Sequence, residues 1–378
     1  MKFPKTVILA LGSNLGDRRQ NLQIAMERIH ASIGWIHKVS RVYETPAWGF
    51  KGESFLNACI AVSTRLEAAD ILSVLLGIEI DMGRQRTDDK TYQNRIIDLD
   101  ILLIEDEIID TPNLQVPHPG IANRRFVLQP LTDIAAGDVH PILKKAYRKL
   151  LVETSDTSEV VAINETLEIP GKNYKFPRCN YIAVEGNIGA GKTSFSTMVS
   201  QDFNAKLVLE RFKDNPFLPK FYENKDRYAF PLEMSFLADR YQQLSDDLAQ
   251  YDLFKDFVIS DYDVFKSLIF ARITLHEDEY SLYHKLFHLM YKELVKPELY
   301  IYLYQNTERL LENIKKRGRD YEQNIQPDYL IEINKSYLNY IKSQSNMKVK
   351  VIDISNLDFV SNREDYLQLL EEIEKAVN

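Results

Sequence analysis

The sequence contains few cysteines and no long apolar run. Its two cysteines, Cys59 and Cys179, are too few for a disulfide framework and lack the spacing of a metal site. No apolar segment reaches the length of a membrane span. The apolar run near the N-terminus has no cleavage site, so we expect a first strand there rather than a signal peptide. These absences predict a cytoplasmic protein with reduced cysteines and no membrane partner.

The sequence also lacks an excess of positive charge. It contains 47 Lys and Arg residues against 55 Asp and Glu residues, which gives a formal net charge of −8 at pH 7. A basic surface that covers a whole domain is therefore not expected, and nucleic acid is disfavoured as the main partner. Internal repeats and low-complexity tracts are absent too.

The length and the apolar content favour two domains. A chain of 378 residues is long enough for two domains of ordinary size, and its 45% hydrophobic residues allow each half a buried core. The segment 163–179 contains prolines and a glycine with weak periodicity, which is typical of a linker. We therefore predict a first domain at 1–162 and a second domain at 180–378.

Strands and helices alternate in both predicted domains. In the first domain the expected strands are 6–11, 35–43, 55–64 and 96–104, and the expected helices are 18–32 and 68–82. In the second domain the expected strands are 181–185, 205–209, 257–260, 299–304 and 349–354. Strands joined by helices in this second series predict an α/β fold with a parallel sheet flanked by helices.

The second domain begins with the spacing of a phosphate-binding loop. Residues 186–193 read GNIGAGKT, between an apolar run and a helix-compatible run. Glycines let the backbone wrap closely around a phosphate, Lys192 adds a positive charge, and the Thr193 hydroxyl is a candidate Mg²⁺ ligand. The alternative is a glycine-rich turn without a ligand. The candidate nucleotide-binding residues are Gly186, Asn187, Ile188, Gly189, Ala190, Gly191, Lys192, Thr193 and Ser194.

Two acidic residues follow later strands of the second domain. Glu210 and Asp261 stand at strand ends, where open α/β sheets bind their ligands. One of them is a candidate proton acceptor and the other, Asp261, a candidate Mg²⁺ ligand; the alternative for either is a helix N-cap. Arg317 and Arg319 flank a glycine in a basic run, which predicts a mobile lid over the phosphates rather than a solvated face.

The first domain carries a pair of carboxylates on one strand. Asp98 and Asp100 share a face because side chains alternate along a strand, and their Cα atoms lie about 6.6 Å apart. Such a pair is suited to two Mg²⁺ ions about 3.5–4 Å apart. The flanking Arg84 and Arg95 suggest a polyphosphate substrate. By spacing alone, a surface strand with salt bridges remains an equal alternative.

Further motifs in order extend this first pattern. They are LGSNLG at 11–16, YETP at 43–46, FLN at 55–57, GR at 83–84, VPHP at 116–119 and NRRFVL at 123–128. Together with the acidic strand, these motifs resemble 6-hydroxymethyl-7,8-dihydropterin pyrophosphokinase across essentially the first 160 residues. The resemblance implies a ferredoxin-like α+β fold. It also implies ATP-dependent pyrophosphoryl transfer to the hydroxymethyl group of a reduced pterin, in folate synthesis.

The resemblance also implies roles for single residues. Asp98 and Asp100 would bind two Mg²⁺ ions, and Arg84 and Arg95 would act on the transferring group. His118 and Arg124 would contact the ATP phosphates, and Thr45, Phe55, Asn57 and Phe126 would bind the pterin. An aromatic stack with amide hydrogen bonds suits a flat heterocycle, although the two phenylalanines taken alone fit core packing better.

The second domain resembles the deoxynucleoside kinases over roughly 180–378. The resemblance rests on the phosphate-binding loop, Glu210, NPFL at 215–218, FYE at 221–223 and the basic run near 317. It implies transfer of the γ-phosphoryl group of ATP to the 5′-hydroxyl of a deoxynucleoside, by a homodimer. Glu210 would be the general base, Tyr222 and Glu322 would bind the sugar 3′-hydroxyl, and Arg317 and Arg319 would be lid arginines.

Two positions depart from that family. The triplet Asp261-Tyr262-Asp263 lacks the arginine that commonly follows the acid, so phosphate positioning would rely on Lys192, Arg240 or the lid. Glu233 stands where a base-reading glutamine is common. An ionised carboxylate only accepts hydrogen bonds, which suits guanine, and a protonated one suits adenine. We therefore predict a purine deoxynucleoside; the alternative is that Glu233 pairs with a cation.

The whole chain is therefore predicted to be a bifunctional transferase that uses ATP and Mg²⁺. Its substrates would be a reduced pterin and a deoxynucleoside. An alternative is an active pterin pyrophosphokinase followed by a non-catalytic nucleotide-binding or dimerisation module, which the missing arginine motivates. Retention of Lys192, Thr193 and Glu210 argues against this alternative. A kinase of nucleoside monophosphates is a third, weaker possibility.

Overall fold

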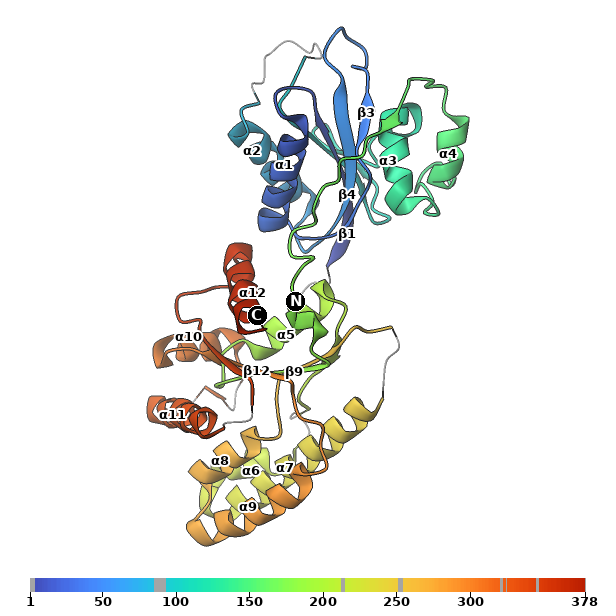
Figure 1. Ribbon diagram of the computed structural model, residues 1–378. Helices are drawn as coiled ribbons and strands as arrows, with labels where there is room; N and C mark the ends of the chain where they lie inside the picture. The colour runs from blue at the N-terminus through green and yellow to red at the C-terminus, as the bar shows by residue number, and fades with distance from the viewer. Residues whose placement is uncertain are drawn as a thin grey trace. The chain divides into compact units, whose positions relative to one another are not determined.

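Figure 1 shows the computed structural model of the chain. It describes residues 4–84, 93–211, 215–250, 254–319, 322–323, 325–344 and 347–377. Contacts divide the chain into two compact units, Met1–Asn173 and Tyr174–Asn378. The division point lies inside the segment that the sequence suggests as a linker, and each unit is described below by itself.

The first unit is built on an antiparallel sheet. Its strands are β1 (Lys5–Ser13), β2 (Trp35–Val39), β3 (Tyr43–Thr45), β4 (Phe55–Thr64), β5 (Asp98–Ile104) and β8 (Val161–Ala162). Their order is β5-β1-β4-β3-β8, and β2 pairs with another part of β4. The helices are α1 (Arg18–Ser32), α2 (Ala68–Asp81), α3 (Arg125–Ala135) and α4 (Tyr147–Glu153). A small separate pair is formed by β6 (Ile109–Asp110) and β7 (Gln115–Val116).

Helices cover both faces of this sheet (Figure 1). Along β1, Val7, Leu9 and Leu11 join one buried cluster with residues of α1 and α2. Ile8 joins a second cluster with residues of α3 and α4. Because successive side chains of a strand point to opposite faces, a strand covered on both sides reads as a continuous apolar run. This arrangement is the expected α+β fold.

The strand expected at 35–43 is in fact two short strands. Ser40 lies between β2 and β3, and its hydroxyl accepts the backbone N–H of Cys59 at 2.9 Å. The same hydroxyl donates to the backbone oxygen of Arg41 at 2.7 Å. A side chain thus replaces one backbone partner of β4, which interrupts the regular ladder and lets β3 pair with a different part of β4.

The first half of the expected linker packs on the first unit. Leu167 is buried in the cluster of α1 and α2, and Ile163 and Ile169 pack against it. Beyond the division point, Phe176 is buried in the short 3₁₀ turn η2 (Phe176–Arg178) of the second unit. Both halves of this segment therefore contain buried apolar side chains, which a freely solvated linker does not.

The second unit contains a parallel sheet of five strands. In spatial order they are β10 (Lys206–Val208), β11 (Val258–Ser260), β9 (Tyr181–Gly186), β12 (Leu299–Tyr304) and β13 (Val349–Asp353). All four pairings are parallel, as the alternation of strands and helices predicts. The carboxyl ends of parallel strands meet at one edge of the sheet. The loop after β9, Glu210 after β10 and Asp261 after β11 are therefore brought to that edge.

Helices connect these strands and build the rest of the second unit. They are α5 (Lys192–Asp202), α6 (Leu218–Glu223), α7 (Lys225–Ala249), α8 (Lys266–Thr274), α9 (Glu277–Tyr291), α10 (Thr307–Arg317), α11 (Pro327–Ser343) and α12 (Arg363–Val377). The core is rich in buried aromatic residues, such as Tyr283 and Phe287 of α9 and Tyr337 of α11. In the described part of the chain, no helix has the length and apolar character needed to cross a membrane.

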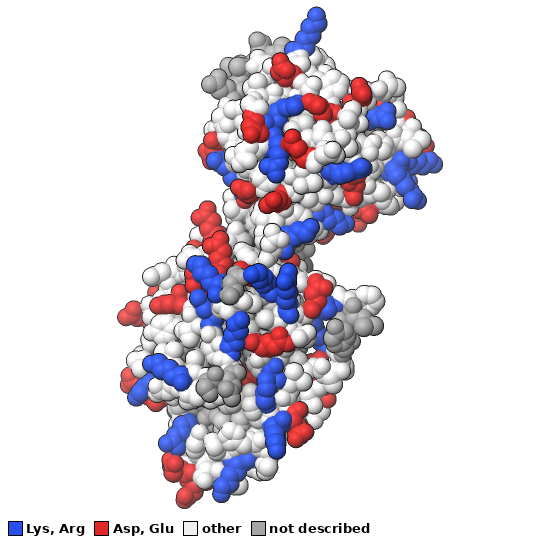
Figure 2. Space-filling view, viewed as in Figure 1, with Lys and Arg blue, Asp and Glu red and all other residues white. Residues whose placement is uncertain are grey.

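The surface carries mixed charge. Figure 2 shows Lys and Arg side chains interspersed with Asp and Glu side chains on the visible face of each unit. This mixture accords with the net charge of −8.

Candidate active sites

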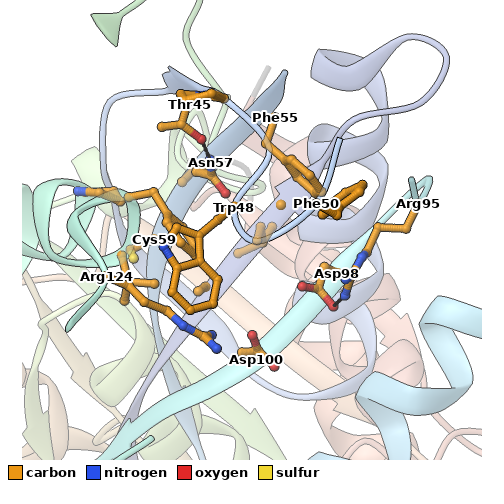
Figure 3. Close-up of a pocket in the computed structure, with 18 residues that line it drawn as sticks. Thr45, Trp48, Phe50, Phe55, Asn57, Cys59, Arg95, Asp98, Asp100 and Arg124 are labelled. Atoms are coloured by element: carbon orange, nitrogen blue, oxygen red, sulfur yellow. Dashed lines mark hydrogen bonds and ion pairs between the residues drawn. The ribbon is translucent and has the colours of Figure 1, made fainter. Parts of the chain in front are cut away.

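The acidic pair of the first unit opens onto a cavity. Strand β5 pairs with β1 so that Asp98 lies opposite Gly12 and Asp100 lies opposite Ala10. Both carboxylates line the same pocket, as their spacing of two predicts (Figure 3). Burial, and then the charge of Asp98, raise the pKa of Asp100 to about 7. Two carboxylates in a partly desolvated site thus repel each other, and a divalent cation would relieve that repulsion.

Both predicted arginines contact only one of the two carboxylates. Arg84 and Arg95 each donate to Oδ1 of Asp98 at 2.7 Å. Arg84 also contacts Glu79 of α2, which is 1% exposed and accepts the backbone N–H of Leu99 at 2.9 Å. Glu79 therefore ties this arginine to β5. The sequence analysis missed Glu79, although a carboxylate in line with the buried residues of a helix indicates an internal partner.

The residues predicted to bind the pterin gather around the same pocket (Figure 3). Nδ2 of Asn57 donates to Oγ1 of Thr45 at 2.8 Å, which orients the amide. The Phe55 ring meets the Phe50 ring edge-on at 6.3 Å between centroids. Thr45, Phe55, Asn57 and Phe126 thus line one cavity, together with Arg95 and both carboxylates. The cavity offers aromatic rings and amide groups, which suits a flat heterocycle.

Two aromatic residues of this pocket were not anticipated. Trp48 and Phe50 lie in the loop between β3 and β4 and line the cavity. The Arg124 guanidinium lies 4.9 Å from the Trp48 ring and 5.9 Å from the Phe126 ring, within the range of cation–π contact. Trp48 is 40% exposed. A tryptophan in a loop rich in Pro and Gly is a sequence signal for such a binding residue.

His118 lies in a neighbouring cavity. That cavity is lined by Asp100, His118 and residues of the segment 110–115, so Asp100 borders both hollows. Nδ1 of His118 accepts the backbone N–H of Gly120 at 3.0 Å. Burial, and then Arg124, lower the pKa of His118, so its ring is neutral at pH 7 and its other nitrogen is a donor. Asp100 therefore stands between a cavity suited to the pterin and a second cavity.

In the second unit, the phosphate-binding loop has the geometry that its glycines require. Gly189 and Gly191 have φ values of +86° and +80°, in the region that favours glycine. A Cβ on Gly189 would lie 3.0 Å from the backbone oxygen of Leu310, so the close approach also requires glycine. Residues Gly189–Ser194 line a cavity that Arg309, Asn313 and Lys316 of α10 also border. Backbone N–H groups at the start of α5 and these cations suit a triphosphate.

Lys192 and Thr193 begin α5. The Lys192 ammonium donates to the backbone oxygens of Gly186 at 2.9 Å and Asn187 at 3.0 Å. Burial, and then repulsion by Lys266, lower the pKa of Lys192 to about 8. The Thr193 hydroxyl donates to the carboxylate of Asp261, which joins two oxygen donors suited to Mg²⁺.

Asn187 belongs to the structure of the loop. Its Nδ2 donates to the backbone oxygen of Leu330 at 2.8 Å and to Oδ1 of Asn334 at 2.9 Å. Its own Oδ1 accepts the N–H of Ile188 at 2.8 Å. The side chain thus anchors the loop to α11. Only the backbone of Asn187 remains available for the predicted contact with the nucleotide.

Glu210 lies between two cations. Its Oε1 accepts from Nε of Arg240, on α7, at 2.8 Å, and its Oε2 accepts from Nζ of Lys266, on α8, at 2.7 Å. Its backbone N–H donates to Asp261 at 2.8 Å. Burial alone would raise the pKa of Glu210, but Lys266 and Arg240 outweigh it and keep this pKa far below its ordinary value. The carboxylate is therefore ionised at neutral pH. Lys266 was not among the residues predicted from the sequence.

Glu233 lines the cavity and has one buried carboxylate oxygen without a hydrogen-bond partner among the described residues. It lies on α7, is 3% exposed, and its Oε1 accepts from the Thr274 hydroxyl at 2.9 Å. Its Oε2 is buried and has no hydrogen-bond partner within the described residues. Burial, opposed by Arg240, raises the pKa of Glu233 to about 7. Glu233 forms no ion pair with a described cation at 4 Å or less, so the alternative of a direct cation partner finds no support.

The predicted lid lies at the end of α10. This helix ends at Arg317 and is capped by Gly318, whose φ is +72°. Arg317 and Arg319 both line the cavity. Arg319 donates to Oε1 of Glu322 at 3.1 Å, and Arg317 contacts the other oxygen. Glu322 is thus bound by both lid arginines. The side chain of Tyr222 lies outside the described residues.

One cavity collects most of the predicted kinase residues. It is lined by Ile188, Lys192, Thr193, Glu210, Glu233, Arg240, Asp261, Arg317, Arg319 and Glu322, and by Lys266. Phe221, Phe236 and Phe270 add an apolar wall. The cavity therefore joins a cationic end beside the phosphate-binding loop to an aromatic end beside Glu233.

Comparison with known protein families assigns each half of the chain. The family model described as 7,8-dihydro-6-hydroxymethylpterin-pyrophosphokinase matches residues 8–136, and the deoxynucleoside kinase model matches residues 182–378. The chain belongs to both families. Its first unit is a pterin pyrophosphokinase and its second unit is a deoxynucleoside kinase, so the bifunctional transferase expected from the sequence is confirmed.

Two relatives with similar sequences support the two assignments. A deoxyguanosine kinase of Bacillus subtilis is 37% identical over 201 residues, which cover 52% of this chain and 97% of the relative. A 2-amino-4-hydroxy-6-hydroxymethyldihydropteridine pyrophosphokinase of Porphyromonas gingivalis is 42% identical over 138 residues, which cover 36% of this chain and 93% of the relative. A solved structure of a deoxyadenosine kinase from M. mycoides matches 52% of this chain and 99% of its own, at 23% identity and a TM-score of 0.45.

Proposed function

We propose that the pterin pyrophosphokinase unit acts on 6-hydroxymethyl-7,8-dihydropterin, and that the kinase unit phosphorylates the 5′-hydroxyl of a purine deoxynucleoside. Both reactions would use MgATP. The observation that carries the first assignment is the position of Asp100 on the border of two cavities. The observation that carries the second is the unpartnered buried oxygen of Glu233.

In the first unit, the donor set fits Mg²⁺. The described residues contain no cluster of three or more His, Cys, Asp or Glu side chains that could form a closed metal site. Mg²⁺ needs no such cluster, because it binds through one or two carboxylates together with substrate phosphates and water. Asp98 and Asp100 would supply those carboxylates. Bound Mg²⁺ would neutralise the charge on the transferring pyrophosphoryl group.

The other groups of the first unit would orient the substrates. Arg84 and Arg95 form ion pairs with Asp98 and would contact the pyrophosphoryl group from one side. His118 and Arg124 would contact ATP phosphates. Asn57 and the aromatic rings around it would fix the pterin so that its hydroxymethyl oxygen faces the acidic pair.

In the kinase unit, Glu210 would accept the proton of the 5′-hydroxyl. Its low pKa makes it a weak base, which suits a phosphoryl transfer whose transition state needs little help from a base. Thr193 and Asp261 provide hydroxyl and carboxylate oxygens in contact, which fits Mg²⁺ bound to ATP. Lys192 and the lid arginines would stabilise the charge of the γ-phosphoryl group.

Glu233 would recognise the nucleobase of the deoxynucleoside. Its Oε1 already accepts from Thr274, so Oε2 is the oxygen available to a ligand. An ionised carboxylate would accept the N1–H and N2–H donors of guanine, and a protonated one would both donate to and accept from adenine. Thymine offers only one donor. The relative from Bacillus subtilis is named a deoxyguanosine kinase, which supports this preference.

The test is a panel of the four deoxynucleosides and the reduced pterin, each with MgATP and the full chain. We expect turnover of the pterin and of at least one purine deoxynucleoside, with purines ahead of thymidine and deoxycytidine in kcat/KM. A kcat/KM for thymidine above those for both purine deoxynucleosides would refute the proposed recognition of the nucleobase by Glu233. Failure with the pterin would refute the assignment of the first unit's substrate.

Two further properties are proposals that follow from the sequence and the family. The kinase unit would associate as a homodimer, and the protein would reside in the cytoplasm. Light scattering of the full chain tests the first of these: a mass of one chain at micromolar concentration contradicts it.

A further inference from the structure

Lys266 is the cation that the reading of single motifs did not anticipate. It is the first residue of α8, and its ammonium lies 2.7 Å from Oε2 of Glu210. Only 11% of its side chain is exposed, and Phe270 lies beside its ammonium at 5.6 Å from the ring centroid. A lysine in such a desolvated place requires an anionic partner at every stage of the reaction.

The surroundings of Lys266 carry more positive than negative charge. The cations Lys192, Arg240, Lys266, Arg317 and Arg319 line the cavity, against the carboxylates of Glu210, Glu233, Asp261 and Glu322. Lys266 and Lys192 are close enough that each opposes the other's charge. A cavity with surplus cations beside a phosphate-binding loop is arranged for an anion that arrives with the substrate.

The loop before α8 also lacks the arginine that is common in this family. Tyr262 stands where the family commonly has an arginine, and it is fully buried in the core. Its side chain therefore does not contribute to the cavity. Lys266 lies four residues further along the chain, at the start of the following helix, and lines the cavity.

We propose that Lys266 supplies the missing phosphate-facing charge and exchanges partners during the reaction, from Glu210 to the transferred phosphoryl group. The 5′-oxygen forms a bond to the γ-phosphorus, and the bond from that phosphorus to the β,γ-bridging oxygen breaks. The proton of the 5′-hydroxyl passes to Glu210, and ADP leaves. Glu210 releases this proton to water, and Lys266 turns to the new 5′-phosphate while Arg240 remains paired with Glu210. This inference rests on the proposed role of Glu210 as proton acceptor.

The experiment compares Lys266→Met with Lys266→Arg in the full chain, with Lys285→Met as the control. Lys285 is an exposed residue of α9 with the same charge. We expect Lys266→Met to lower kcat by about 100-fold, the usual effect of removing one fixed group that stabilises transition-state charge. We expect its affinity for the product 5′-monophosphate to fall by about tenfold, while the affinity for the nucleoside changes by less than about threefold. Lys266→Arg should keep the monophosphate affinity.

The difference between the two ligands is what a structural role would not produce. Equal loss of monophosphate and nucleoside affinity in Lys266→Met, or unchanged monophosphate affinity, overturns the exchange of partners. If Lys266→Met does not fold, Lys266→Arg decides: a tenfold loss of monophosphate affinity there also overturns it. Binding is measured at equilibrium without turnover, so it is independent of the general base. A Glu210→Gln variant with wild-type kcat would instead refute only the role of Glu210.

Discussion

The two candidate sites of this chain have opposite arrangements of charge. In the pterin pyrophosphokinase unit, two carboxylates form the centre, and the arginines Arg84 and Arg95 lie on one of them. In the kinase unit, the cations form the centre, and Glu210 lies between Arg240 and Lys266. By its charge, the first arrangement would need divalent cations before a polyphosphate is attracted, whereas the second would attract phosphate by itself.

The architecture of each sheet explains this difference. The acidic pair belongs to one strand of an antiparallel sheet, so its two members share a face through alternation alone. The kinase site lies at the carboxyl edge of a parallel sheet, where Glu210, Arg240 and Lys266 come from three separate elements. A parallel sheet therefore assembles a charge cluster from residues that are distant in sequence.

The largest expected effect comes from removing the lysine of the phosphate-binding loop. Lys192→Ala should lower deoxynucleoside phosphorylation by about 1,000-fold, because a buried cation no longer stabilises the γ-phosphoryl group. Pterin pyrophosphokinase activity of the same polypeptide should stay within about twofold, since its site lies in the other unit. Steady-state assays of both reactions on one preparation measure this. Parallel loss of both activities would show that the sites are not independent.

The next variant changes the site of the pterin pyrophosphokinase unit and leaves the kinase site intact. Asp100→Asn removes one of the two carboxylates that would bind Mg²⁺ and should lower pyrophosphoryl transfer by about 100-fold or more. Nucleoside phosphorylation should be unchanged. Asp106→Asn, at an exposed position of the turn after β5, is the matched control. Normal pyrophosphoryl transfer by Asp100→Asn would contradict a metal role for the acidic pair.

A pH series tests how Glu233 recognises the nucleobase of the substrate. Glu233 faces Arg240 on its own helix, Lys266 and Thr274 on α8, and Tyr283 on α9, whose hydroxyl donates to its backbone oxygen. Its pKa is raised to about 7, mainly by burial. The carboxylate is protonated below this pH and ionised above it, so preference for deoxyguanosine over deoxyadenosine should rise with pH.

We expect the ratio of kcat/KM for the two purines to change by about 100-fold between pH 6 and pH 8, because the ionised fraction rises about tenfold while the protonated fraction falls about tenfold. In Glu233→Gln the ratio should be constant, because an amide does not titrate in this range. A pH-dependent ratio in the glutamine variant would assign the titration to another group.

The smallest expected effect concerns the support of Glu233. Thr274→Val removes the hydroxyl that donates to Oε1 and should reduce the free energy of unfolding of the kinase unit by about 1 kcal/mol. It should also raise KM for the purine by a few-fold, because the carboxylate loses its orientation. Denaturant unfolding and steady-state kinetics measure the two effects. Ser343→Ala, which removes a hydroxyl at an exposed position of α11, is the control.

Much of the fold could be read from the sequence. The bounds of α1 and of strands β4 and β12 were predicted to the residue, since apolar periodicity is strong there. The break at Ser40 was missed, because nothing in a local pattern shows that a hydroxyl will replace a backbone partner. The packing of Leu167 was missed for a similar reason: one apolar residue in a segment without periodicity carries no signal of its contacts.

What the sequence by itself determined is the chemistry with a local spacing. The phosphate-binding loop and the pair Asp98 and Asp100 depend on neighbours within a few residues, so their geometry follows from backbone conformation alone. Only the tertiary structure decided which cations meet Glu210 and which oxygen of Glu233 is left for a ligand. Arg240 and Lys266 lie 30 and 56 residues beyond Glu210, and their meeting depends on how helices pack against a parallel sheet.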